Sequence, residues 1–108
     1  MPFKFINMKG NFSNIVNSDT PVLVDFYATW CGPCKAQTPI INDLAKDMNS
    51  ALRVIKIDID KNQNIAQQYQ VRGVPTLALY KKGKLLWRAS GVHSKAQLTN
   101  IIQPHLNE

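Results

Sequence analysis

Two cysteines, Cys31 and Cys34, are the residues whose type and spacing best suit chemistry, and the chain has no others. An apolar run over residues 22–28 precedes them, and residues 35–48 have a helix-like pattern. Residues three apart on a helix face each other, and a disulfide needs a Cα separation of about 4.4–6.8 Å. The pair can therefore be a dithiol or a disulfide with little backbone movement. Cys-x-x-Cys between a strand and a helix predicts a redox site.

The residues of the motif predict how the pair is tuned. Cys31 would lie at the helix N-terminus, where free N–H groups and the macrodipole lower a thiol pKa and raise the thiolate fraction. Cys34, one turn into the helix, is expected to be more buried and to remain a thiol. Pro33 suits the first helical turn but removes a donor that could stabilise the thiolate. Because a less stabilised thiolate makes the pair more reducing, Gly32-Pro33 favours a reductase over a strong oxidant.

A zinc site and a static disulfide are the two other uses of such a cysteine pair. A closed structural zinc site needs four ligands. His93 and His105 have eleven residues between them, which misses the usual His-x₃₋₅-His spacing. A static disulfide is disfavoured in the reducing cytosol. We therefore expect no metal and a pair that cycles between two redox states.

Asp25 interrupts the apolar run 22–28. That run is rich in β-branched and aromatic residues, which is typical of a central strand buried on both faces. A carboxylate there would lose its hydration, and the loss would raise its pKa. The alternative is an aspartate at a solvated rim of the strand.

Length and composition indicate one small domain. The chain has 108 residues, of which 44% are hydrophobic, so we expect a single domain over residues 1–108 with a modest core. No run approaches the ~20 apolar residues of a membrane helix. Residues 1–7 lack the apolar core of a signal peptide. The expected location is the cytoplasm, without membrane association.

The net charge of +6 has two interpretations. Basic residues cluster near a predicted hairpin, at Lys81, Lys82, Lys84 and Arg88. They can form a solvated basic hairpin that contributes to solubility, or they can steer acidic protein partners. Nucleic-acid binding is not expected, because no recognition motif is present and only Trp87 supplies an aromatic ring in the cluster.

Hydrophobic patterns predict the elements that would position these residues. Strands are predicted over residues 3–6, 22–28, 52–59, 76–81 and 85–90. Helices are predicted near residues 12–16, over 35–48, after a cap at Asp60, and from a capping box at residues 94–97, with Pro104 disturbing the final turns. The predicted apolar stripe of the second helix comprises Ala36, Ile40, Ile41, Leu44, Ala45 and Met48. Alternating elements followed by a hairpin predict an α/β protein with a mixed sheet and helices on both faces.

The segment from Val24 to Lys35, VDFYATWCGPCK, resembles the active-site region of the thioredoxin family. Further matches follow in family order over nearly the whole chain, at Pro39, residues 56–60, residues 72–76, Gly83 and Gly91. The resemblance implies a thioredoxin fold, with a central mixed sheet of about five strands flanked by four helices. It places the redox motif at the end of a central strand.

The resemblance also implies roles for individual residues. Cys31 would be the nucleophile and Cys34 the resolving thiol, with Asp25 beneath Cys34 exchanging its proton and Lys56 tuning that aspartate. The implied substrate-docking residues are Trp30, Gly73, Val74, Pro75 in the cis form, Thr76 and Gly91. The alternatives are a packing role for Trp30, a snorkelling surface position for Lys56 and ordinary loop positions for the two glycines.

The implied activity is that of a monomeric protein-disulfide reductase with no bound cofactor. Its electrons would come from NADPH through a separate flavin-containing thioredoxin reductase, and its substrates would be disulfide-containing proteins. A thiol oxidant or isomerase, and a docking partner of a specific protein, are the competing interpretations. Departures from the family pattern at Tyr27, Ala36-Gln37 and Pro104 leave the choice of partners open.

Overall fold

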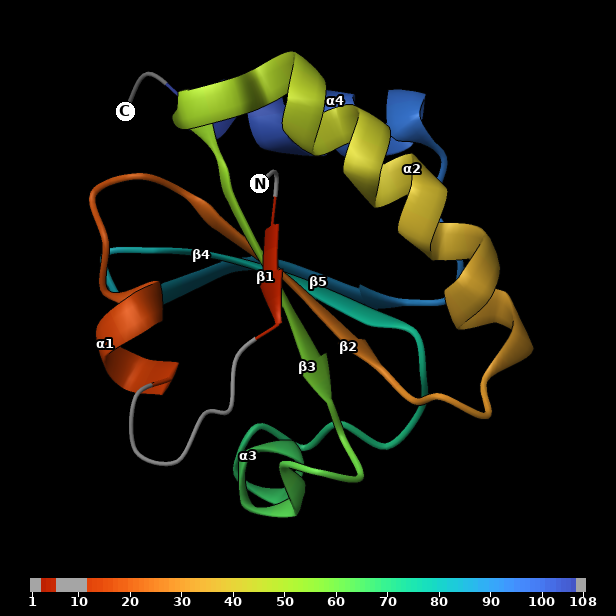
Figure 1. Ribbon diagram of the computed structural model, residues 1–108. Coiled ribbons are helices and arrows are strands. Elements are labelled where there is room, and N and C mark those ends of the chain that lie inside the picture. The colour runs from red at the N-terminus through yellow and green to blue at the C-terminus, as the bar shows by residue number, and fades with distance from the viewer. Residues whose placement is uncertain (1–2, 6–11, 107–108) are drawn as a thin grey trace.

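The computed structural model describes residues 3–5 and 12–106, which form one mixed sheet with helices on both faces (Figure 1). Within those residues the strands are β1 (Phe3–Phe5), β2 (Val22–Tyr27), β3 (Arg53–Asp58), β4 (Thr76–Lys81) and β5 (Lys84–Ser90). The α-helices are α1 (Phe12–Val16), α2 (Gly32–Met48), α3 (Gln63–Gln68) and α4 (Lys95–Ile102), and two 3₁₀ turns span Asn49–Ala51 and Gln103–His105. The predicted fold class, with about five strands and four helices, is confirmed.

Strand β2 lies at the centre of the sheet, whose strand order is β1-β3-β2-β4-β5. It pairs in parallel with β3 and antiparallel with β4, and β5 completes the hairpin with β4. In this register Asp25 is opposite Lys56 on β3 and Leu77 on β4. The prediction of a central strand over residues 22–28 is confirmed, with the strand ending at Tyr27. Residue 6 of the predicted first strand lies outside the described residues.

Alternation along β2 divides the interior into two clusters, because successive side chains of a strand point to opposite faces. Val22, Val24 and Phe26 pack with residues of α1 and α3. Leu23 packs with α2 and α4, at residues that include Ile41 and Leu98. Figure 1 shows α2 and α4 together on one side of the sheet and α1 and α3 on the other. Asp25 therefore belongs to the face that α2 and α4 cover.

Helix α2 begins at Gly32, within the Cys-x-x-Cys motif and earlier than the predicted residue 35. The predicted stripe is confirmed at Ile41, Leu44 and Ala45, which are buried, and at Ile40 and Met48, which pack partly against the same cluster. It is wrong at Ala36, which is exposed, while Gln37 is buried. The reason is helical register: residues 34, 37, 41, 44 and 48 recur at intervals of three or four, and residue 36 lies off that face.

The predicted cap at Asp60 is wrong, because α3 begins at Gln63 with Asn62 in the cap position. Asp58 instead organises the connection, since its Oδ1 accepts from the backbone N–H groups of Asp60 at 2.9 Å and Lys61 at 3.3 Å. An aspartate that bonds backbone two residues on forms a local turn. The turn occupies the residues between β3 and α3, so α3 begins later in the sequence than a cap at Asp60 would place it.

In the C-terminal third of the chain, the observed turn, helix cap and helix end agree with the sequence predictions. Lys82 and Gly83 form the β4–β5 turn with φ values of 53° and 79°, which suits a tight hairpin. Ser94 and Gln97 make the predicted capping box of α4. Pro104 lies in the 3₁₀ turn that replaces the last helical turns. Across the described residues, we find no helix with the length and apolar character needed to span a bilayer.

Candidate redox site

Cys31 and Cys34 are joined by a disulfide at the start of α2, with Cα atoms 5.3 Å apart. Cys31 is the N-cap residue, with extended backbone angles φ −89° and ψ 111°. Its Sγ accepts a hydrogen bond from the backbone N–H of Cys34 at 3.1 Å. The motif therefore places one sulfur where the unpaired N–H groups of a helix point, as its position before the helix predicted.

The two cysteines are equally buried in this disulfide form, each 3% exposed. The prediction that Cys34 would be the more buried of the two is therefore wrong here. The reason is packing around the disulfide: Ala28 is buried with the pair, and Tyr27, Ile59 and Val74 pack against it. The side chains that enclose one sulfur thus enclose both.

Trp30 lies on the surface beside the disulfide and is 69% exposed. Its Nε1–H donates to Asp60 Oδ2 at 2.9 Å, which fixes the indole across the loop after β3. The alternative of a packing role for Trp30 is therefore wrong. An exposed aromatic ring next to a reactive group is instead a typical feature of a binding surface.

The Val74-Pro75 bond is cis, as the resemblance implied, and Val74 packs against the cysteine cluster. Thr76 Oγ1 donates to the carbonyl of Gly73 at 2.6 Å across this turn. The N–H of Gly91 donates to the Pro75 carbonyl at 2.9 Å. The loop of residues 73–76 and the loop of Gly91 are therefore held together beside the cysteine pair, at one end of the sheet.

Gly73 and Gly91 leave open backbone at this end of the sheet. A Cβ atom at either position would find no atom within 4 Å beyond the neighbours along the chain. Gly91 also has a φ of 91°, a conformation that side-chain-bearing residues rarely adopt. The space beside both residues is available to another chain.

Asp25 is fully buried at 0% exposed, so the interpretation of a solvated rim position is wrong. Neither of its carboxylate oxygens has a hydrogen-bond partner within the described part of the chain. Loss of hydration raises the pKa of this carboxyl from its usual 3.8 to about 6, and the positive charge of Lys56 opposes the rise. A buried acid that titrates near neutral pH can exchange protons under physiological conditions.

Lys56 is 5% exposed, so it is not a snorkelling surface lysine. Its ammonium donates to Thr38 Oγ1 at 2.6 Å and lies 4.7 Å from the centre of the Tyr27 ring. Thr38 Oγ1 in turn donates to the Cys34 carbonyl at 3.2 Å. Burial lowers the pKa of Lys56, and the nearby Asp25 charge raises it. Thr38 thus connects Lys56 with the helical turn of Cys34, a role that sequence reasoning missed.

Gln37 is the other residue near the site that sequence reasoning missed. Its side chain is 0% exposed and bonds the backbone of His93 twice, with Nε2 donating to the carbonyl at 3.0 Å and Oε1 accepting from the N–H at 2.8 Å. The available signal was a long polar residue on the apolar stripe of an amphipathic helix. The sequence did not indicate which residue would be its partner, because His93 lies 56 residues away.

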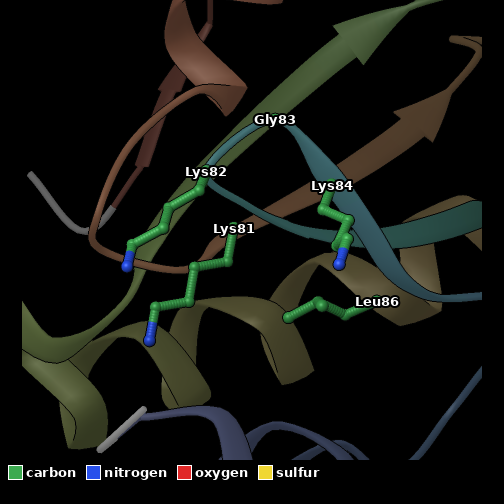
Figure 2. Close-up of a pocket in the computed structure, with 5 residues that line it drawn as sticks. All are labelled: Lys81, Lys82, Gly83, Lys84 and Leu86. Atoms are coloured by element: carbon green, nitrogen blue, oxygen red, sulfur yellow. The ribbon is translucent and has the colours of Figure 1, made fainter.

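The basic cluster lies at the opposite end of the sheet, because β4 runs antiparallel to β2 and leads away from the disulfide. Figure 2 shows Lys81, Lys82 and Lys84 around the turn at Gly83, with Leu86 alongside. These five residues line a hollow of about 490 Å³. Lys82 and Lys84 are exposed, in agreement with a solvated hairpin.

Two members of the predicted basic cluster bond to carbonyl groups of the protein, and of these Lys81 is buried and Arg88 half-buried. Lys81 is 7% exposed and its ammonium donates to the His105 carbonyl at 3.1 Å. The guanidinium of Arg88 donates to the carbonyls of Tyr69 and Gln70 at the end of α3. Both side chains satisfy carbonyl groups at the ends of helical segments, where cations are favoured. The fully exposed positive charges of the hairpin are therefore those of Lys82 and Lys84.

The residues considered as zinc ligands lie in different parts of the protein. The sulfur atoms of Cys31 and Cys34 bond to each other, and His93 and His105 lie apart from one another. His93 Nδ1 is 2.9 Å from the Gly91 carbonyl, near the docking loops. His105 belongs to the C-terminal 3₁₀ turn, at the end of the sheet where Lys81 lies. Within residues 3–5 and 12–106, no three His, Cys, Asp or Glu side chains gather as metal ligands would.

Residues 4–104 match the sequence model of the family described as Thioredoxin. A thioredoxin of Acidithiobacillus ferridurans is 48% identical over 94 residues, which cover 87% of each chain. One of Haemophilus influenzae is 42% identical over 94 residues, covering 87% of this chain and 88% of its own. The crystal structure of a Malassezia sympodialis thioredoxin superposes with a TM-score of 0.87 at 28% identity, covering 96% of this chain and 90% of the other. The chain therefore belongs to the thioredoxin family of protein-disulfide oxidoreductases, with Cys31 and Cys34 as its redox-active pair.

Proposed function

We propose that this protein is a general reductase of protein disulfides that works through a mixed disulfide with its substrate. The observation that carries the proposal is the disulfide at the start of α2, where the Cys34 N–H points at Cys31 Sγ. The same N–H would stabilise a thiolate on Cys31 after reduction, because hydrogen bonds to charged acceptors are the stronger ones. We therefore assign Cys31 as the nucleophile.

In the first step the Cys31 thiolate attacks one sulfur of the substrate disulfide. A new S–S bond joins Cys31 to the substrate, the substrate's own S–S bond breaks, and the leaving thiolate takes a proton from solvent. Trp30, the cis Val74-Pro75 turn and Gly91 form the surface on which the substrate docks. Open backbone at Gly73 and Gly91 lets an extended segment approach closely, and Thr76 holds the turn in shape.

In the second step Cys34 resolves the mixed disulfide. Its proton passes to the Asp25 carboxylate, its thiolate attacks Cys31 Sγ, and the substrate leaves as a thiolate that is then protonated. Two electrons have moved from the protein dithiol to the substrate. The pKa of Asp25, about 6, suits a proton acceptor near neutral pH, and Lys56 keeps it from rising further.

The cycle needs a reductant to restore the dithiol. We assign this to a separate thioredoxin reductase that supplies electrons from NADPH, since a dithiol couple by itself transfers only one electron pair. We further propose that residues 1–108 act as one monomeric domain in the cytoplasm and bind neither metal nor nucleic acid. The reducing tendency expected of Gly32-Pro33 supports that location.

The experiment that tests the proposal combines insulin reduction by dithiothreitol with trapping of mixed disulfides. The parent protein should accelerate the reduction of insulin. Cys34→Ser should accumulate mixed disulfides through Cys31, because the resolving thiol is absent, while Cys31→Ser should trap almost none. Abundant trapping by Cys31→Ser would reverse the assignment of the two roles.

Two measurements separate the competing functions. An oxidant or isomerase would have a more oxidising reduction potential than a reductase, so equilibration with a glutathione redox buffer decides between them. A docking partner whose function needs no redox chemistry would keep its biological activity in a variant with both Cys31→Ser and Cys34→Ser. Loss of activity in that variant is the expected result.

A further inference from the structure

We propose that Gln37 is a positioning residue that fixes the loop of residues 91–94 as part of the docking surface, and so sets the preference for protein disulfides over small ones. This inference rests on the proposed function, because it assigns that loop to substrate docking. Gln37 lies three residues after Cys34, on the same face of α2. It therefore connects the helix that carries the redox pair with a loop far along the chain.

The contact between Gln37 and His93 is well suited to hold one arrangement. The amide is fully buried, and both ends of it bond to the backbone of a single residue, at 2.8 and 3.0 Å. A buried polar group that loses its partner costs more than a typical hydrogen bond contributes. Any displacement of the loop would leave the Gln37 amide and both backbone groups of His93 without these hydrogen bonds. The loop therefore has little freedom to move.

From His93 the connection continues into the docking surface. Its Nδ1 lies 2.9 Å from the Gly91 carbonyl, and its ring contacts the Trp87 ring edge-on at a centroid distance of 5.3 Å. The N–H of Gly91 donates to the Pro75 carbonyl. The path from α2 therefore runs through His93 and Gly91 to the cis-proline turn beside the disulfide.

Only a substrate with chain on both sides of its disulfide can use this loop. Gly91 is exposed and its backbone is open, so it can contact an extended segment next to the substrate cysteine. A small disulfide reaches the pair without that contact. A loop that is already ordered spares a protein substrate the cost of ordering it on binding. Loosening the loop should therefore slow the reaction with proteins selectively.

The test compares two substitutions of Gln37 in the pre-reduced full chain. Gln37→Met keeps a similar length but removes both hydrogen bonds. Gln37→Glu keeps the acceptor and regains a donor only when its carboxyl is protonated, which burial favours. Ile41→Val is the matched control, since it alters a buried residue one turn further along the same face without touching His93. Second-order rate constants are measured with insulin and with hydroxyethyl disulfide.

The decisive quantity is the ratio of the insulin rate constant to the hydroxyethyl disulfide rate constant. In Gln37→Met this ratio should fall about fivefold to tenfold relative to the parent, and the His93 amide should exchange hydrogen faster. In Gln37→Glu the ratio should recover as the pH falls from about 8 to about 6. Ionisation of the Cys31 thiol and of Asp25, whose pKa is about 6, also changes the rate constants of the parent, so each variant's ratio is divided by the parent ratio at the same pH. The Ile41→Val ratio should equal that of the parent.

An unchanged ratio in Gln37→Met would overturn the inference, and so would a ratio that falls equally in Ile41→Val. If Gln37→Met does not fold, the inference is overturned instead by a Gln37→Glu ratio that, once divided by the parent ratio, does not change with pH. Failure of the proposed function has a different signature, because the parent itself would then reduce neither disulfide at an appreciable rate.

Discussion

The two faces of strand β2 contribute to the protein in different ways. Val22, Val24 and Phe26 enter a cluster of aliphatic and aromatic side chains that α1 and α3 cover. On the other face Asp25 alternates with them, near buried Lys56 on the neighbouring strand and beneath the helix that carries the cysteines. Burial stabilises the fold on both faces, since Leu23 on the second face packs with α2 and α4, but at Asp25 it also raises the proton affinity of a carboxyl. The first face thus serves packing alone, whereas the second combines packing at Leu23 with chemistry at Asp25.

The largest effect on stability should come from the apolar face. Phe12 is 3% exposed and contacts the rings of Phe26, Tyr69 and Tyr80. Phe12→Ala should lower the free energy of unfolding by about 3–5 kcal/mol. Its pH dependence should stay that of the parent, since no charged group is altered. Urea unfolding between acid and mildly alkaline pH checks both points, with Phe12→Leu as the milder control.

Asp25→Asn should have the next largest effect, with the opposite sign. The folded pKa of Asp25, about 6, lies above the usual 3.8, so the parent loses stability as the pH rises through 6. That difference corresponds to about 3 kcal/mol at pH 8. The variant should therefore be more stable than the parent at pH 8, with little or no advantage below pH of about 4.

The same substitution also tests the proposed proton transfer. Without the carboxylate, resolution of the mixed disulfide should slow, most clearly at a pH where hydroxide is scarce. Urea unfolding of the oxidised protein and single-turnover reduction of insulin measure the two effects. A variant less stable than the parent at pH 8, with unaltered kinetics, would mean that burial of Asp25 has neither consequence.

Thr38→Val should have an intermediate effect, on the face of the sheet that carries Asp25 and Lys56. It removes the hydroxyl that accepts from Lys56 and donates to the Cys34 carbonyl, at nearly constant side-chain volume. Because Lys56 is charged and buried, the free energy of unfolding should fall by about 1–2 kcal/mol. Thr38→Ser keeps the hydroxyl and should recover most of the loss. Equal losses in both variants would attribute the effect to packing of the methyl group.

The smallest effect on stability is expected at the hairpin, far from both clusters. Lys82→Gln with Lys84→Gln should change the free energy of unfolding by less than about 0.5 kcal/mol, because both side chains are exposed. If the hairpin steers acidic partners, association with an acidic protein substrate should slow at low salt and not at high salt. Lys46→Gln with Arg53→Gln is the control of equal net charge. The same slowing in both double variants would indicate a general charge effect.

Much of the fold could be predicted because its signals are local. The hairpin at Lys82-Gly83 and the capping box at Ser94 depend on residues within a few positions of each other. The cap expected at Asp60 was wrong for the same local reason, since Asp58 formed a competing turn. The cis bond before Pro75 came from the resemblance to a family and not from the residues themselves.

The polar contacts around the site were less predictable, because each joins segments distant in sequence. Gln37 meets His93 at a separation of 56 residues, and Lys56 meets Thr38 at a separation of 18. The burial of Lys81 likewise depends on the C-terminal turn that supplies its acceptor. No periodicity or spacing rule identifies such partners, since they follow from how α2 and α4 pack on the sheet.

The sequence by itself determined the redox pair, the central strand that leads to it and the helix that begins there. Those features depend on residue type, alternation and spacing within about one helical turn or one strand. These are local properties of the sequence and do not depend on how distant segments pack. The tertiary structure alone decided that Asp25 loses all contact with water, that Lys56 turns to Thr38, and that Gln37 holds the loop of Gly91. Burial and hydrogen-bond partners are properties of the packed interior, which exists only after distant segments have come together.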